Sequence, residues 1–280
     1  MKQKEILYLH LAVMFFGLSG VIARFVEIPA VLIVLGRVSC STSLLGILLL
    51  IGKKRFRLQQ WKHYLLLGMT GCVLAVHWTT FFRSIQVSTV AIGTITFSTF
   101  PLFVTFLEPL FYKEKLKKEN IISAVVLLVG VLITIPEFSM ENSMTRGIAW
   151  GMVSSFSYAI MTLANRYFSK HYEGMLICFY EQGTAALVLV PVLFFVRVSW
   201  HTKDVIGVLV VGFLCTALAY TLFVTAQRKL KAQTVGLISG MEMVYAILYA
   251  LLFLQEIPSI REIIGGVIIL AVALYSTWRT

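Results

Sequence analysis

The ionisable side chains inside long apolar stretches are the residues best suited to chemistry, and Glu242 is the first candidate. Tyr245 and Tyr249 follow it at i+3 and i+7, which places a carboxylate and two phenols on one helical stripe. A carboxylate beside aromatic faces can hold an ammonium group by charge and cation-π attraction. It can also exchange a proton, or simply hydrogen-bond to a neighbouring helix. We therefore treat Glu242 as a candidate for both substrate binding and coupling.

Aromatic residues near the middle of two other apolar stretches form a second candidate group. Trp78 and Tyr220 stand at equivalent positions of the repeat described below and could form opposite walls of a pocket. His77, beside Trp78, is a candidate for binding and for coupling. The alternative is structural, since membrane histidines often bond to a neighbouring helix and aromatic stripes often only pack.

Three further polar residues complete the candidate set. Arg37 could receive a substrate carboxylate with bidentate geometry, and Glu181 could be a coupling carboxylate. Both could instead hydrogen-bond to the ends of helices or pair with another residue inside the protein. Tyr158 shares a polar stripe with Thr162 and Asn165, and we expect Tyr158 to line a binding site.

The elements that position these residues are expected to be membrane helices. The 280 residues are 59% apolar and 13% charged, against roughly 45–50% and about 25% in soluble domains. This excess disfavours soluble enzymes and disordered proteins. The net charge of +11 falls in short clusters between apolar runs, which indicates loop charges and not a nucleic-acid surface. The four cysteines have no metal or disulfide spacing, so neither a metal nor a cofactor is expected.

Cutting the chain at its charge and turn clusters gives ten segments long enough to span a bilayer. The expected spans are 5–26, 30–52, 64–84, 89–111, 120–137, 146–165, 174–196, 204–225, 234–254 and 261–278. Most of the 24 lysines and arginines fall on the side that holds the N-terminus. Because positively charged loops remain cytoplasmic, both termini are predicted to be cytoplasmic in a multi-pass protein of the cell membrane.

The two halves of the chain carry the same pattern. Residues 110–114 and 121–125 match residues 252–256 and 263–267 at an offset of 142, the separation of Glu114 and Glu256. The same offset pairs Arg24 with Arg166. Because polar residues stay in register, the pattern indicates duplication. We expect capping or loop anchoring, not substrate chemistry, from the two glutamates.

A unit of five spans is odd, so its second copy must enter the membrane from the opposite side. The predicted fold is therefore an all-α integral membrane protein of ten transmembrane helices in two inverted five-helix repeats, residues 1–138 and 139–280. Inverted repeats serve alternating access, in which small rocking motions expose a central site to one side and then to the other.

The arrangement of these motifs resembles the EamA-type transporters of the drug/metabolite transporter superfamily. The first half contributes Ser88-Thr89-Val90-Ala91, Pro101 and Glu114; the second contributes Ala232-Gln233-Thr234-Val235-Gly236, Glu242, Glu256 and Gly265-Gly266. The resemblance implies ten helices around a central cavity and secondary transport of amino acids or small metabolites, often outward. Met243 stands where the family often has proline after the glutamate, so no helix break is expected there.

The predicted function is secondary active transport of a small polar metabolite, with amino acids or related compounds favoured and proton coupling an option. The alternative substrates are organic cations or quaternary amines, held by Glu242 and its aromatic neighbours. A multi-span membrane enzyme is less favoured because no HExxH, GxSxG or paired acidic motif occurs, and no phosphate-binding loop suggests ATP drive. Expected partners are a small-molecule substrate and membrane lipids, without nucleic acid; a homodimer is left open.

Overall fold

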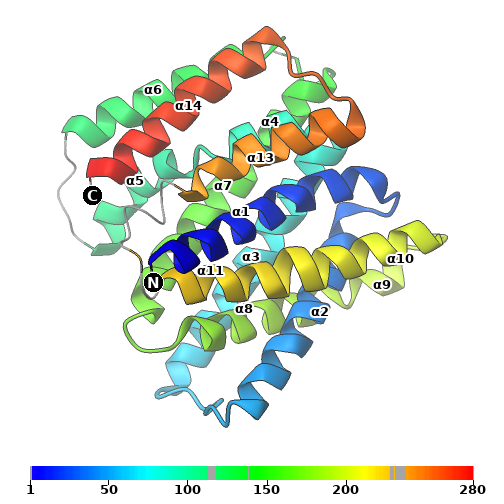
Figure 1. Cartoon of the computed structure of the whole chain (residues 1–280), viewed down its shortest axis with the longest axis vertical. Coiled ribbons are helices and arrows are strands. Elements are labelled where there is room, and N and C mark those ends of the chain that lie inside the picture. The colour runs from blue at the N-terminus through cyan, green and yellow to red at the C-terminus, as the bar shows by residue number, and fades with distance from the viewer. Residues whose placement is uncertain (1, 113–117, 138, 228–229, 231–237, 280) are drawn as a thin grey trace.

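The computed structural model describes residues 2–112, 118–137, 139–227, 230 and 238–279, and this part of the chain contains helices but no strand. Glu114 and the segment 232–236, singled out above, lie outside the described residues, as does the side chain of Gln227. The helices pack as one bundle in which α6 and α14 lie side by side along one edge (Figure 1).

The first half of the chain contains six helices in the described residues. They are α1 (Lys2–Phe25), α2 (Ala30–Ile51), α3 (Trp61–Val87), α4 (Val90–Phe97), α5 (Phe100–Tyr112) and α6 (Lys118–Thr134). The second half contains α7 (Ser143–Phe168), α8 (Gly174–Leu189), α9 (Val192–Phe195), α10 (Thr202–Leu209), the π-helix η1 (Val210–Leu218), α11 (Ala219–Gln227), α13 (Met241–Tyr249), the π-helix η2 (Ala250–Leu254) and α14 (Ile260–Arg279).

The bundle has the dimensions and surface of a membrane protein. Seven helical stretches of the described residues are long and apolar enough to cross a bilayer, and Ile121–Thr134 and Met241–Leu254 are shorter apolar helices. Large apolar side chains such as Phe195, Leu110 and Leu252 are exposed on the outside, whereas Arg37 and Glu181 are buried. Lipid accommodates such a surface, because apolar side chains lose nothing by facing hydrocarbon.

Several expected spans are divided where their sequence disfavours a straight α-helix. The span 89–111 is α4 and α5, interrupted at Ser98 and Thr99 just before Pro101, whose ring restricts the preceding residue. The span 174–196 breaks at Pro191 into α8 and α9. The span 204–225 is continuous but changes to π geometry over η1. No break occurs at Met243, as expected, because α13 runs through it.

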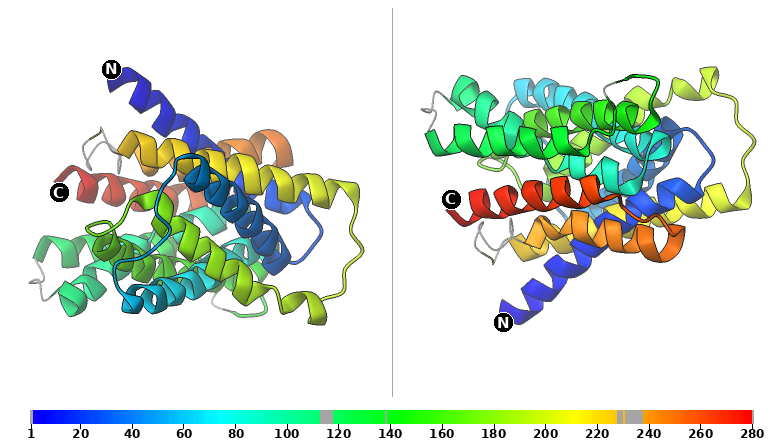
Figure 2. Two further views of the ribbon diagram at one scale, coloured as in Figure 1. Left: turned by 90° about the horizontal axis from the view of Figure 1, so that it is seen from below. Right: turned by 90° about the horizontal axis from the view of Figure 1, so that it is seen from above.

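The two ends of the bundle carry different connections. Both views of Figure 2 place the start of α1 and the end of α14 at one end, which we call the terminal end, and the α9–α10 connection at the other, which we call the distal end. At the distal end, Glu27 donates its backbone N–H to Asp204, and Arg261 donates to the carbonyl of Ile135. At the terminal end, the backbone N–H of Gln59 bonds to Tyr172.

Contacts between the halves come in matched pairs. Helix α1 packs on α11 and α13, as α7 packs on α3 and α4; α2 packs on η1, as α8 packs on α3. The pairs α2 with α8 and α6 with α14 complete the set. These contacts therefore have counterparts in which the equivalent helices of the two halves exchange places.

Small residues allow the closest of these contacts. A Cβ at Gly147 would meet Ser88, and one at Gly151 would meet Thr96, so this pair of glycines allows α7 to pack closely on the first half. Gly71 allows α3 to pack equally closely on α8, since a Cβ at this position would lie 2.6 Å from the carbonyl oxygen of Glu181. The absence of this side chain sets the position of α8, and with it the position of Glu181.

We expect Gly71→Ala to lower the unfolding midpoint in detergent, because the added methyl group must push α8 away at a cost of about 1–3 kcal/mol. The matched control is Gly68→Ala, one turn earlier on α3, where a Cβ would meet nothing within 4 Å. That change should be neutral or stabilise by about 0.5–1 kcal/mol, since alanine is the better helix former. Equal midpoints for the two variants would contradict this account of the α3–α8 contact.

Candidate functional site

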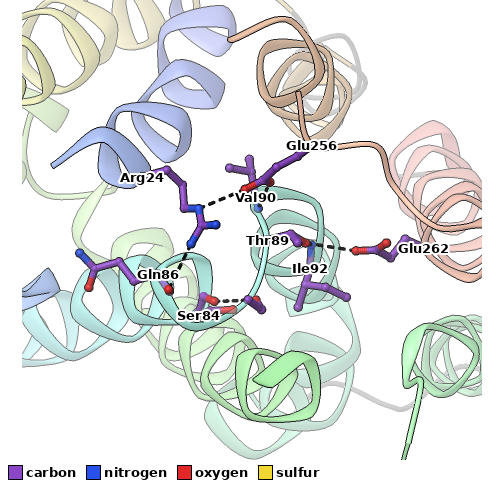
Figure 3. Close-up of polar contacts among 9 residues, drawn as sticks. Arg24, Ser84, Gln86, Thr89, Val90, Ile92, Glu256 and Glu262 are labelled. Carbon is purple, nitrogen blue, oxygen red and sulfur yellow. Dashed lines mark hydrogen bonds and ion pairs between the residues drawn. The ribbon is translucent and has the colours of Figure 1, made fainter. Parts of the chain in front are cut away.

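A network of polar contacts joins the two halves at the distal end (Figure 3). Arg24 Nε bonds to Glu256 Oε1 at 3.0 Å, and its Nη1 bonds to the carbonyl of Gln86 at 3.2 Å. The second carboxylate oxygen of Glu256 accepts the backbone N–H of Val90 at 2.9 Å. Glu256 therefore caps α4 and pairs with α1, which confirms the anchoring role predicted for it.

The start of α14 supports the same network. Thr89 donates its hydroxyl to Glu262 and accepts the N–H of Ile92, both at 3.1 Å (Figure 3). Glu262 also accepts the N–H of Ser259 at 2.6 Å, while the Ser259 hydroxyl accepts the N–H of Glu262. This is a capping box, readable in the sequence as Ser259 followed three residues later by Glu262. Glu256 and Glu262, from the second half, thus hold the start of α4 in the first half.

At the terminal end, the residue equivalent to Arg24 makes a related contact. Arg166 on α7 forms an ion pair with Glu108 on α5, and its guanidinium lies 4.5 Å from the centroid of the Tyr112 ring. Tyr112 returns a hydrogen bond of 2.8 Å from its hydroxyl to the carbonyl of Leu163. Each of the two equivalent arginines therefore pairs with a carboxylate of the other half, at opposite ends of the bundle.

Between these ends lies a cavity of about 360 Å³, within the range of roughly 300–1,000 Å³ usual for small-molecule pockets. Seven of the predicted site residues line it: Arg37, His77, Trp78, Tyr158, Glu181, Tyr220 and Glu242. Thr162 and Asn165, the stripe companions of Tyr158, also line it. The structure thus gathers polar residues from both halves around one space.

Arg37 organises one part of the wall. Its guanidinium carbon lies 3.8 Å from the centroid of Trp78 and 5.2 Å from that of Phe82, which gives the buried charge two aromatic faces. Its Nε donates to Thr216 Oγ1 at 3.1 Å. Thr216 lies in η1 and donates in turn to the carbonyl five residues earlier, that of Val211, at 2.7 Å, which is the spacing of a π-helix.

Glu242 faces the same cavity, close enough to Arg37 for the two charges to interact. No ion pair within salt-bridge distance joins them among the described residues. Arg37 therefore balances the charge of Glu242 without direct contact, a pairing that the sequence did not predict.

Tyr245 and Tyr249 do not line this cavity, so the structure does not bring the two phenols to the site together with Glu242. The Tyr245 hydroxyl lies 2.9 Å from His10 Nδ1 on α1, and Tyr249 packs in the core against the ring of Phe253. The i+3 step turns Tyr245 towards α1, and the i+7 step carries Tyr249 about 10 Å along the axis, beyond the cavity.

His77 is held by α7 while it lines the cavity. Its Nδ1 lies 2.9 Å from the carbonyl oxygen of Ser154 and 2.9 Å from the hydroxyl of the same residue. Its ring packs against Phe97 and Tyr158, with centroids 5.3 and 5.0 Å away. These contacts fit the structural role considered for His77, because its Nδ1 already bonds to Ser154 of a neighbouring helix.

Glu181 lies on α8, only 2% exposed, beside the side chains of Asn165 and Thr70. Gln182, also 2% exposed, lines the cavity next to it, and sequence reasoning did not select it. The signal was available, because Glu181-Gln182 is a polar pair within an apolar segment. Cys178, one turn earlier, lies beside Tyr220.

Comparisons with known proteins agree with this architecture. The chain is 23% identical over 277 residues to the uncharacterized transporter YxxF of Bacillus subtilis, covering 96% of this chain and 88% of that protein. It is 27% identical over 202 residues to an uncharacterized transporter of Archaeoglobus fulgidus, covering 71% of each. A crystal structure of another protein superposes with a TM-score of 0.67 at 16% identity, covering 99% of this chain and 97% of that one, which shows a shared fold.

The family comparison gives the same answer twice. The EamA-like transporter family matches residues 3–135 and again residues 145–278, so nearly all of the chain is accounted for by two copies of one unit. The chain is therefore an EamA-like transporter of the drug/metabolite transporter superfamily.

Proposed function

We propose that the protein is a secondary active transporter that moves a small polar metabolite through the central cavity by alternating access. The observation that carries the proposal is the cavity itself, where Arg37, Glu181 and Glu242 are gathered inside an apolar bundle. Burying such groups is costly in a membrane, and they persist where a polar ligand passes. Amino acids and related compounds are the favoured substrates, because they carry charges that these residues complement.

The mechanism rests on ten transmembrane helices in two inverted repeats, residues 1–138 and 139–280. Three observations support this arrangement: the matched contacts between the halves, the two family matches, and the opposite placement of the Arg24 and Arg166 ion pairs. In such a protein, rocking one half against the other opens one end while it closes the other. Arg24 with Glu256 would hold the distal end closed in the arrangement seen here.

Positive loop charge favours a location of both termini, and so of the terminal end, on the cytoplasmic side of the cell membrane. The lining residues of α7 and α8 fall mainly in the halves of those helices nearest the terminal end, whereas those of α1 and α3 fall in the halves nearest the distal end. In an export cycle, the terminal end would open to receive a cytoplasmic substrate. Glu181, Glu242 and His77 are the candidates for proton coupling, His77 less so because Ser154 holds its ring. The chain is proposed to act without enzymatic chemistry.

Flux measurement tests this function directly. Purified protein in proteoliposomes should exchange at least one labelled amino acid or related polar metabolite, and Arg37→Gln should lower that exchange about tenfold or more, because a charged contact with a substrate carboxylate is lost. An imposed pH gradient reports whether protons take part. Exchange of quaternary amines alone would favour the alternative substrates, although Tyr245 and Tyr249 are not at the cavity to help bind them. No flux for any compound class would contradict the transporter proposal.

We expect Glu256→Gln to change the rate of exchange by about 5–30-fold, because it weakens the distal contact by about 1–2 kcal/mol in one of the two conformations. The ranking of substrates should be unchanged, since Glu256 does not line the cavity. The matched control is Glu27→Gln at the same end, whose ion pair with Lys203 is far more exposed, at 63% for Glu27 against 17% for Glu256. Equal effects of the two changes on initial rates would refute a closing role for Glu256.

A further inference from the structure

The charges around the cavity do not balance. Arg37 and Glu242 interact with one another, but no lysine or arginine among the described residues forms an ion pair with Glu181. A carboxylate that is 2% exposed and without a cation is costly, because the protein interior solvates it poorly. The site therefore lacks one positive charge on the side formed by α7 and α8.

The same place also holds acceptor atoms without a donor, although the side chains of Asn165 and Thr70 approach the carboxylate of Glu181. Three buried oxygens there have no hydrogen-bond partner: Oε1 of Glu181, Oε1 of Gln182 and Oδ1 of Asn165. All three residues line the cavity, and all three atoms are acceptors. Buried polar atoms are nearly always paired in folded proteins, so three unpaired acceptors together require an explanation.

The surrounding structure leaves no room to repair this deficiency from within. The close contact at Gly71 fixes α8 against α3 at Glu181, and the Thr70 hydroxyl already donates to the carbonyl of Leu67 at 2.9 Å. The ring of His77 is engaged with Ser154. A molecule in the cavity can supply both the missing charge and the missing donors.

We propose that Glu181, Gln182 and Asn165 form a subsite for a primary ammonium group of the transported substrate. An ammonium carries one positive charge and three N–H donors, which is what one carboxylate and three unpaired acceptors lack. Quaternary amines fit poorly because they have no N–H. The assignment moves the ammonium from Glu242, where the sequence pattern had placed it, to α8. It rests on the cavity being the substrate site.

Arg37 complements this subsite from another part of the wall. Its Nε is used by Thr216, whereas its two Nη atoms make no hydrogen bond within the described part of the chain. These atoms are available to a carboxylate. A molecule with a primary ammonium and a carboxylate would satisfy both deficiencies, whereas one without the ammonium would leave Glu181 uncompensated.

The test compares ligands that differ only in the amine. Purified full-length protein in detergent is titrated with leucine and isocaproate, phenylalanine and hydrocinnamate, and isobutylamine and isobutanol. In at least one pair, the amine-bearing member should bind about tenfold more tightly or better, since burying an unpaired carboxylate is avoided. The change Glu181→Gln should remove most of that preference while leaving the amine-free member nearly unaffected. Gln182→Met should reduce the preference by a smaller factor.

The control is Glu173→Gln at the start of α8, where the carboxylate is exposed and pairs with Lys54 outside the cavity. It should keep the full preference for the amine. The proposal is overturned if no pair shows the preference for the amine. It is also overturned if Glu181→Gln lowers the unfolding midpoint but leaves the preference for the amine unchanged, because Glu181 would then have only a structural role. Flux in proteoliposomes separates the two proposals: transport with an unaltered preference in Glu181→Gln refutes the subsite alone, and amine binding without any flux refutes the transporter alone.

Discussion

Hydrocarbon offers no hydrogen bonds, so every polar group inside this bundle must find its partner within the protein or in a ligand. Most do so locally: the hydroxyls of Thr94 and Thr80 donate to backbone carbonyls one turn earlier on their own helices. Others reach across, as Ser84 does to the carbonyl of Gly147. Against this background, three of the buried acceptors without a partner stand out, because Glu181, Gln182 and Asn165 all line one cavity. Polar groups with partners therefore stabilise the bundle, whereas the unpaired acceptors at the cavity are available to a ligand.

The broad architecture could be predicted because apolar length and loop charge are encoded locally. The lengths of the apolar runs indicate where helices can span the membrane, and the recurrence of Arg24 as Arg166 indicates the duplication. The divisions inside spans were less accessible. Pro101 and Pro191 signal their breaks. The π geometry of η1, which packs against α2 and accepts the Arg37 hydrogen bond at Thr216, has no comparable signal.

The candidate site could be predicted as a set of residues but not as a set of contacts. Helical spacing correctly selected Tyr158, Thr162 and Asn165 as one face, since a single helix decides that question. It misplaced Tyr245 and Tyr249, because the neighbouring helix α1 decides which part of the α13 surface is covered. It also ranked Glu242 above Glu181. Whether a carboxylate lies near a cation depends on a neighbouring helix. Only the packed structure shows that Arg37 of α2 lies near Glu242 and that no such cation pairs with Glu181 in the described part of the chain.

The distal end shows how one half of the molecule depends on the other for its local structure. The first turn of α4 begins at Val90, whose backbone N–H is satisfied by Glu256 from beyond η2, not by a residue of its own half. Parting the halves there would release that amide to water, because its acceptor leaves with the second half. Deuterium uptake at this one position thus records how often the distal end opens, without an attached probe or added ligand.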